Sequence, residues 1–424
     1  MCIEVILYGR YLVAQCVAQR NGPGLIMAVS GIGASDIISA TVGGATYGTT
    51  LLWALVLGAF FKFILTEGLA RWQLATGTTL LQGWARYLPR WVLLLFCGYL
   101  VLWSIAVSGA LISGCGLAVV NLSGGKVSFA VAAIGHAVVA FVLLQFAGNA
   151  VVGRIIKPLI AAMFISVVVC AALSFRDLNA VLRGLFVPAI PSGGARYVFS
   201  LIGGIGGSLT LLNYNYLLRD EQRVAPANLR YVRIDLALAY LFTAVFGLSV
   251  TLIAARVFHA AGIPVTDNEA VSRMAGQLTE VTGPPGFYVY SIGFWAAVLA
   301  SLFGVWQTVP HIFADCWDLL RRRAPAPIAG NSSHRPASYT VALSFMALAA
   351  VPFAFVQRPL FFVVAFTILG SLFIPFLAAT LLHLNNRVAW PSAIRRNRPI
   401  TNVVLACVLL VFLVVGAIEV LSLF

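Results

Sequence analysis

Two glycine-rich stretches decide the fold of this chain. The first is Ser30-Gly31-Ile32-Gly33-Ala34-Ser35-Asp36, and the second is Gly203-Gly204-Ile205-Gly206-Gly207-Ser208. Each interrupts a segment that is otherwise apolar and long enough to form a helix. Glycine in a helix interior costs about 1 kcal/mol relative to alanine. The six glycines therefore predict interrupted helices, with breaks at Gly31, Gly33, Gly203, Gly204, Gly206 and Gly207.

The composition of the whole chain is that of a bilayer-embedded protein. Of its 424 residues, 61% are hydrophobic and 9% are charged, and the mean hydropathy is +0.97. Soluble domains carry about 25% charged residues, and a helix needs about 20 apolar residues to cross the hydrocarbon core. We therefore predict an all-α integral membrane protein with about eleven transmembrane helices, at 24–48, 51–75, 92–120, 127–148, 154–174, 197–218, 232–258, 286–310, 338–357, 360–384 and 402–423.

The interrupted segments are the first and the sixth of these spans, so they lie five spans apart. This spacing predicts two repeats of five helices, and an odd number of helices gives the second repeat the opposite orientation in the membrane. Interrupted first helices of inverted repeats mark a binding site near the bilayer midplane, where unwound carbonyl groups face the substrate. The alternative is close helix packing through small residues, which explains one stretch alone better than it explains both.

Asp36 is the only acid within either interruption. An ionisable group inside a membrane costs about 3 kcal/mol or more unless it is paired or hydrated, which makes it a functional candidate. We predict that Asp36 is the main anionic ligand of a small cation, because hard cations prefer oxygen ligands. Neutral oxygens would come from Ser35, Ser208 and Asn213. The alternative is that Asp36 caps the second half of its own helix.

The basic residues predict the orientation of the chain. With the N-terminus inside, the inner segments carry 18 of the 27 lysines and arginines, the outer segments carry seven, and Lys62 and Arg71 lie within the second span. This asymmetry follows the positive-inside rule. It also accounts for the net charge of +14, because the charge is spread over short loops and not gathered in a nucleic-acid-binding patch.

The second span carries further charge. Glu67 and Arg71 are spaced i,i+4 and are predicted to pair with each other. Lys62 can extend to an interface if one is near, or it can take part in a gate. We group Lys62, Glu67 and Arg71 as a possible gate or charge network.

Several stretches resemble a known family. They are GPGLIMAV at 22–29, ATYGTTLLW at 45–53, ARWQLATG at 70–77, NYL at 215–217 and SLFIPF at 371–376. In this order, over most of the chain, they resemble the NRAMP family of divalent-metal transporters. The resemblance implies the LeuT-type fold, in which spans one to five and six to ten form inverted repeats and an eleventh span follows.

The family signatures are altered in this chain. The first-span signature Asp-Pro-Gly-Asn corresponds to residues 33–36, so that Gly33 stands at the Asp position and Asp36 at the Asn position. The sixth-span signature Met-Pro-His-Asn corresponds to residues 211–214, where Asn213 is polar but the thioether that favours transition metals is absent. The resemblance therefore implies a rewritten coordination sphere.

The remaining family positions are also changed. Ser208 matches a small residue whose carbonyl group contributes to the site, and Thr367 falls near the glutamine of span ten. The third-span acids that serve proton movement align with Trp103 and Ala106, and the later sixth-span histidine aligns with Leu218. The resemblance implies that Gly33, Ser208 and Thr367 join Asp36 in the site, and that the proton route differs.

From these features we predict a secondary transporter that moves a divalent cation, of the Mn, Fe or Mg type, by alternating access. The chain has no Walker loop, HExxH or nucleophile elbow, so no enzyme is predicted, and neither is a resident cofactor, a nucleic-acid partner or an obligatory protein partner. Two alternatives remain: a LeuT-type carrier of a small organic solute, and a non-transporting membrane sensor or scaffold.

The predicted organisation follows the repeats. Residues 1–20 form a cytoplasmic segment, 21–176 the first repeat, 177–196 an external connector, 197–384 the second repeat, and 385–424 an inner loop and the eleventh helix. We predict a bacterial inner membrane, with the N-terminus cytoplasmic and the C-terminus external. No cleavable signal peptide is predicted.

Overall fold

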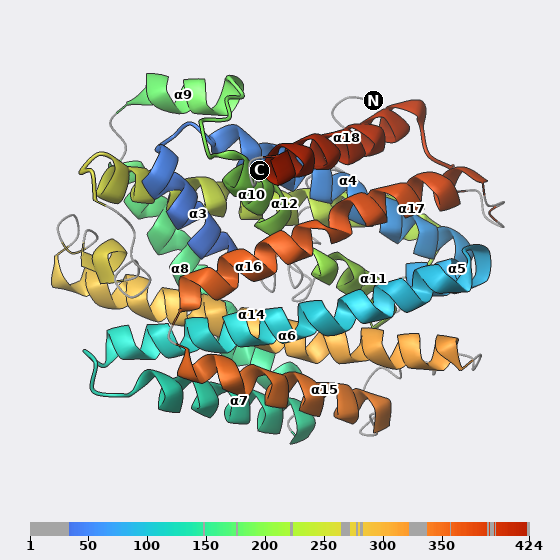
Figure 1. Ribbon diagram of the computed structural model, residues 1–424, viewed down its shortest axis with the longest axis horizontal. Coiled ribbons are helices and arrows are strands. Elements are labelled where there is room, and N and C mark those ends of the chain that lie inside the picture. Colours follow the sequence, from blue (N-terminus) through green and yellow to red (C-terminus); the bar gives the residue numbers. More distant parts are fainter. Residues whose placement is uncertain are drawn as a thin grey trace.

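The computed structural model (Figure 1) describes residues 34–146, 149–174, 177–220, 224–263, 272–276, 279, 283–321, 337–356, 358–387, 390, 394 and 396–421. Every regular element in these ranges is helical. The first half contains α3 (Ala34–Tyr47), α4 (Leu52–Thr76), α5 (Leu80–Tyr87), α6 (Arg90–Leu122), α7 (Phe129–Phe146) and α8 (Asn149–Ser174). The connector holds α9 (Leu178–Phe186).

The second half begins with α10 (Ala195–Gly204), η1 (Leu209–Leu212), α11 (Asn213–Asp220), η2 (Pro226–Asn228), α12 (Leu229–Ala254) and the π-turn η3 (Ala255–His259). It continues with α14 (Pro284–Leu320), α15 (Ala337–Ala350), η4 (Val351–Phe355), α16 (Pro359–Ser371), α17 (Phe373–Arg387) and α18 (Pro399–Leu421). The long helices α6 and α14 pack along each other, and α7 and α15 cover them on one side (Figure 1). On the other side α3 packs against α10, α12 and α16.

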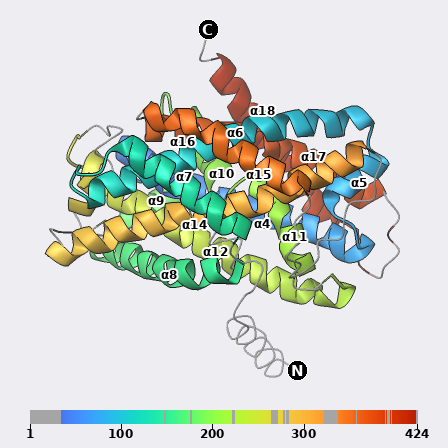
Figure 2. The ribbon, with the colours of Figure 1, turned by 90° about the horizontal axis from the view of Figure 1, so that it is seen from below.

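Within the described ranges, eight helices are long and apolar enough to cross a membrane, or nine if the bent pair Met163–Leu173 and Leu178–Phe186 is one span. All eleven predicted spans coincide with helix, although the first is described only from Ala34 onward. The apolar part of α18, Pro399–Val415, is shorter than the other spans, and α18 lies at the edge of the molecule (Figure 2). The number eleven therefore stays a prediction.

Large apolar side chains are exposed along the peripheral helices. Examples are Leu95, Leu102, Val131, Val138, Val341, Leu348, Leu410 and Leu413, of which Leu348 is 73% exposed. An apolar surface of this extent is unfavourable in water and favourable in lipid. Asp36, Lys62, Ser200 and Thr367, which are discussed below, are instead buried where α3, α4, α10 and α16 pack together.

Two short helices lie in segments that the sequence analysis treated as connectors. Helix α5 begins with a capping box, in which Thr79 Oγ1 accepts from the Gln82 amide at 3.3 Å and Gln82 Oε1 accepts from the Thr79 amide at 3.0 Å. This pattern of Thr followed three residues later by Gln is a sequence signal for a helix start. Helix α9 is capped by Asp177, whose carboxylate accepts from the Ala180 amide at 3.0 Å.

The tenth predicted span, 360–384, is not one continuous helix. Helix α16 ends at Ser371 and α17 begins at Phe373, so the helix is interrupted at Leu372. Pro375 explains the interruption, because proline lacks the amide hydrogen that would bond to the carbonyl group of Ser371. The interruption lies beside the site described next, since Ser371 Oγ donates to the Phe199 carbonyl of α10 at 3.2 Å.

Candidate metal site

The sixth span is broken at the predicted glycines. Helix α10 ends at Gly204, Ile205 is extended with ψ of 126°, and η1 begins at Leu209. Gly206 and Gly207 have φ of 67° and 72°, a left-handed conformation that glycine adopts without a steric penalty. The predicted break of span six is therefore confirmed. The glycines of the first break, Gly31 and Gly33, lie outside the described residues.

The backbone of this break binds a lysine. The ammonium group of Lys62, on α4, donates to the Gly203 carbonyl at 2.7 Å and also to the carbonyl groups of Ile205 and Gly207. Lys62 is fully buried. Three carbonyl oxygens thus converge on one point because the chain leaves helical geometry between Gly204 and Leu209.

Asp36 contacts the same loop. It lies in the first turn of α3 and is buried, and its Oδ1 accepts a hydrogen bond from the Gly206 amide at 2.8 Å. Asp36 also interacts electrostatically with Lys62. The carboxylate predicted as the main ligand therefore lies at the break of span six, where it contacts the loop between the two halves of that span.

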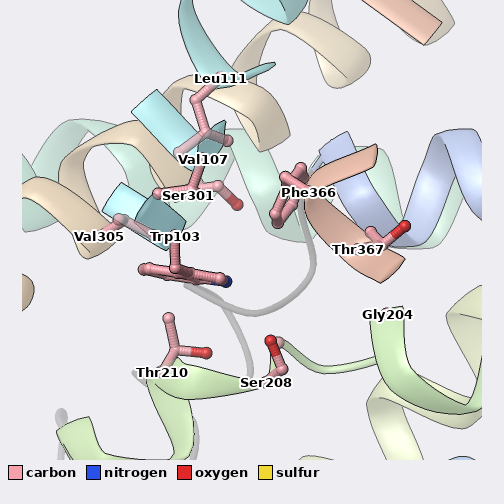
Figure 3. A pocket seen from close by; sticks show the side chains of 11 residues that line it. Trp103, Val107, Leu111, Gly204, Ser208, Thr210, Ser301, Val305, Phe366 and Thr367 are labelled. Carbon is pink, nitrogen blue, oxygen red and sulfur yellow. The ribbon is translucent and has the colours of Figure 1, made fainter. Parts of the chain in front are cut away.

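A small cavity lies beside this loop (Figure 3). It is lined by Gly204, Gly207, Ser208, Thr210, Trp103, Val107, Leu111, Ser301, Val305, Phe366 and Thr367, and its volume is about 30 Å³. That volume admits a guest of the size of a water molecule. The structure therefore brings Ser208 and Thr367, two predicted site residues, to one cavity.

Thr367 is held in place by a chain of hydroxyl groups. Its Oγ1 lies 2.9 Å from Ser200 Oγ of α10, which in turn lies 3.2 Å from Ser39 Oγ of α3. Thr367 Oγ1 also donates to the Val364 carbonyl at 2.8 Å. These bonds join α3, α10 and α16 around the break. Ser39 and Ser200 were not predicted as site residues, because serine in a membrane helix usually bonds within its own helix.

Three buried polar atoms near the break have no hydrogen-bond partner among the described residues. They are Trp103 Nε1, Thr210 Oγ1 and Asn213 Oδ1. Trp103 and Thr210 line the cavity, and in Figure 3 the ring of Trp103 lies beside Thr210. Asn213, a predicted ligand, is buried at the start of α11 but does not line the cavity. Unpartnered buried polar atoms are costly and point to a missing water or ligand.

The predicted site residues thus fall into two groups around one loop. Asp36 and Lys62 bind the loop backbone, whereas Ser208 and Thr367 face the cavity. The backbone of Ser35 is part of α3, but its side chain and Gly33 lie outside the described residues. The part of the chain that the structure describes holds no group of three or more His, Cys, Asp or Glu side chains able to bind a metal. A metal here would have at most one carboxylate, that of Asp36, and would depend otherwise on backbone, hydroxyl and amide oxygens.

The predicted gate or charge network of Lys62, Glu67 and Arg71 does not form one cluster of contacts. Glu67 and Arg71 form the expected i,i+4 ion pair, at 3.3 Å, but Lys62 binds the break of span six instead. Residues five apart on a helix are separated by about 140° around its axis, whereas residues four apart share a face. Lys62 therefore points to a different neighbour from Glu67 and Arg71.

The Glu67 network joins three parts of the fold. Glu67 Oε1 accepts from Arg233 of α12 at 2.8 and 2.9 Å, and Arg71 donates to Asn397 Oδ1 at 2.7 Å and to the Arg396 carbonyl at 3.2 Å. The side chains of Arg71 and Glu67 are 3% and 8% exposed, whereas Arg233 is 42% exposed. The network ties α4 to α12 and to the segment that precedes α18.

We expect Glu67→Gln to lower the apparent unfolding temperature of the detergent-purified protein. Removing one partner of a buried ion pair leaves the other charge uncompensated, at a cost of about 3–5 kcal/mol. Arg233→Ala is the matched comparison, because a half-exposed ion pair contributes only about 1 kcal/mol or less. Equal losses of thermal stability in the two variants would show that the buried Glu67–Arg71 pair contributes no more to stability than the half-exposed pair with Arg233.

Helix α11, the second half of span six, is anchored by three successive polar side chains. Tyr214 donates to Asp235 of α12 at 3.1 Å, and Tyr216 donates to Asp315 of α14 at 2.9 Å. Between them, Asn215 Nδ2 donates to Gln73 Oε1 of α4 at 2.6 Å. Tyr216 and Asp315 are 4% exposed. The other four side chains are 1% exposed or less. The half-helix below the break is thus fixed to three neighbouring helices.

These features define a class of protein: a polytopic membrane protein whose sixth span unwinds around converging carbonyl groups, as in secondary carriers with discontinuous helices. Comparison with known proteins identifies the family. The sequence model of the family described as "Natural resistance-associated macrophage protein-like" matches residues 24–422. The chain belongs to this family, the NRAMP family, as the sequence motifs predicted.

Individual relatives agree with the family match. The chain is 27% identical over 320 residues to the divalent metal cation transporter MntH of Chromohalobacter salexigens, covering 71% of this chain and 72% of the relative. It is 27% identical to MntH of Bacillus subtilis, covering 66% of this chain and 67% of the relative.

Solved structures share the fold. A mutant of the Eremococcus coleocola manganese transporter superposes with a TM-score of 0.71 at 17% identity, covering 95% of this chain and 86% of that one. MhsT in complex with L-phenylalanine superposes with a TM-score of 0.52 at 13% identity, covering 92% and 98% of the two chains. The LeuT-type fold predicted from the sequence is confirmed.

Proposed function

We propose that this chain is a secondary transporter that carries a divalent metal cation across a membrane by alternating access, with its site at the broken helices. The observation that carries the proposal is the break of span six, where three carbonyl groups converge and Asp36 contacts the loop. Family membership supports the same function, since relatives in this family are named divalent metal cation transporters.

The chemistry of the donor set favours hard cations. The proposed ligands are the carboxylate of Asp36, the hydroxyl groups of Ser208 and Thr367, the amide oxygen of Asn213 and the loop carbonyl groups, all of which are oxygen donors. No side chain that lines the cavity contains sulfur. Oxygen ligands suit Mg²⁺ and Mn²⁺, whereas thioether and thiolate ligands select softer ions. We therefore propose a cargo of the Mn, Fe or Mg type, with Cd²⁺ disfavoured.

Alternating access requires that α3 and the two halves of span six move relative to their neighbours. Opening the site on the α11 side has to break the bonds from Tyr214 to Asp235 and from Tyr216 to Asp315. These buried tyrosine–carboxylate bonds are discrete contacts that can be made in one state and broken in another. We propose that they hold the carrier closed on that side.

The test is ion uptake into proteoliposomes that contain the purified protein, with Mn²⁺, Mg²⁺, Ca²⁺ and Cd²⁺ measured in parallel. We expect saturable uptake of Mn²⁺ or Mg²⁺ above that of empty liposomes, and weaker uptake of Cd²⁺. Ion binding without uptake would favour the sensor or scaffold alternative. Uptake of none of these ions by folded protein would contradict the proposal.

An organic cargo is the other alternative. The oxygen donors of the site and the relatives named divalent metal cation transporters support a metal ion over an organic solute. Competition of Mn²⁺ uptake by organic cations distinguishes the two. We also propose a bacterial inner membrane with the N-terminus inside, which the distribution of 18 inner and seven outer basic residues supports.

A further inference from the structure

The ammonium group of Lys62 lies where a bound cation would lie. It is surrounded by the carbonyl oxygens of Gly203, Ile205 and Gly207, and Asp36 interacts with it electrostatically. An ammonium group has three N–H donors and no acceptor, so the three carbonyl groups match it in number. Converging carbonyl groups together with a carboxylate are also the ligand set of a hard metal ion.

The loop is built to present these oxygens. Left-handed φ angles at Gly206 and Gly207 turn the backbone, so that alternate carbonyl groups face Lys62 while the Gly206 amide faces Asp36. A side chain at Gly206 would approach the ring of Tyr240 to 3.2 Å. Lys62 reaches the loop from α4, 141 residues earlier in the sequence than Gly203, so the contact depends on the folded arrangement of the two spans.

A fully buried ammonium group requires compensation, because removing a charge from water is expensive. The three carbonyl groups and Asp36 supply that compensation for Lys62. The same oxygens could compensate the charge of a metal ion instead. They cannot bind the Lys62 ammonium group and a metal ion at once, because each would lie at about 2–3 Å from the same oxygens.

The carbonyl groups of Gly203, Ile205 and Gly207 form a carbonyl cage in span six. We propose that Lys62 is a tethered cation that occupies this cage in the unloaded carrier, and that the cargo ion must displace Lys62 to bind there. The inference rests on the proposed function in one respect, since it takes the cargo to be a cation that enters this break. Lys62 then compensates the charge of Asp36 and binds the three carbonyl groups when no ion is present. Because it competes with the ion, it lowers the apparent affinity for the ion. Binding of cargo and withdrawal of Lys62 become one event.

The first experiment uses full-length protein in detergent and the variant Lys62→Ala, with Lys126→Ala as the matched control on an exposed loop. Lys62→Ala should unfold at a lower temperature, and millimolar ammonium chloride should restore part of the loss because NH₄⁺ can enter the vacated cage. Tetramethylammonium, which has no N–H donor, should not. Lys126→Ala should respond to neither salt.

The same proteins are compared for Mn²⁺ binding by calorimetry. If Lys62 occupies the cage in nine of ten unloaded molecules, its removal strengthens apparent binding by about tenfold. A folded Lys62→Ala variant with unchanged Mn²⁺ affinity and no ammonium response would overturn the proposal and leave Lys62 a structural residue. Ammonium rescue without Mn²⁺ binding to either protein would uphold the tethered cation and contradict the metal function.

A measurement on the unsubstituted protein covers the case in which Lys62→Ala fails to fold. Amine labelling followed by mass spectrometry should find Lys62 protected without metal and labelled at saturating Mn²⁺. Lys126, which is exposed, should be labelled equally in both conditions. Protection of Lys62 that persists when Mn²⁺ is bound would contradict displacement.

Discussion

Asp36→Ala is expected to reduce Mn²⁺ uptake by about 100-fold or more, since it removes the buried carboxylate that accepts from the Gly206 amide and interacts electrostatically with Lys62. Removing one partner of a buried charge pair costs about 3–5 kcal/mol, and each 1.4 kcal/mol is a factor of about ten in binding. The substitution also removes the only negative charge proposed to bind the cargo. Both effects act on the same step, the entry of the ion into the break.

Asp36→Asn separates the two contributions. The amide oxygen of asparagine can still accept from the Gly206 amide, so the loop should keep its conformation while the charge is lost. We expect Asp36→Asn to fold as the unsubstituted protein does and to remain defective in uptake. Asp177→Ala is the control, because Asp177 is an exposed acid that only caps α9. Saturable uptake by Asp36→Ala at the unsubstituted rate would remove Asp36 from the site.

The second large effect is expected for Gly203→Ala. A β-carbon at Gly203 would lie 1.6 Å from Ser371 Oγ, 2.5 Å from its Cβ and 3.0 Å from its Cα. Helix α10 must therefore move away from α16, which separates Ser200 from Thr367 and displaces a carbonyl group of the Lys62 cage. Overpacking of a buried contact costs about 1–3 kcal/mol. We expect a lower unfolding temperature and loss of uptake.

Two further variants test this reason. Gly98→Ala on α6 should be silent, because no atom lies within 4 Å of a β-carbon at that position. Ser371→Gly in the Gly203→Ala background should restore part of the stability, because it removes the two nearest atoms, Oγ and Cβ. A Gly203→Ala protein with normal stability and uptake would show that α10 and α16 do not need this close approach.

Composition and residue patterns were enough to predict the class of protein and the position of one break. The apolar composition requires a membrane, and the four glycines of Gly203–Gly207 predict non-helical backbone because glycine is unfavourable in a helix interior. The Glu67–Arg71 pair was also predictable, since it depends only on helical spacing. Motifs spread over the chain predicted the family and therefore the LeuT-type fold. The interruption near Pro375 and the capping box of α5 were visible in the sequence but were not predicted.

The assembly of the site, in contrast, depends on how the helices pack in the folded protein. Asp36 meets an amide 170 residues away, and Lys62 meets carbonyl groups 141 to 145 residues away. Backbone groups are the same at every residue, so no side-chain pattern can identify them as partners. The direction of Lys62 depends on how α4 is rotated about its axis and on where α10 ends beside it. Helix packing and the left-handed turn at Gly206 and Gly207, acting together, placed an ammonium group in a cage of carbonyl oxygens.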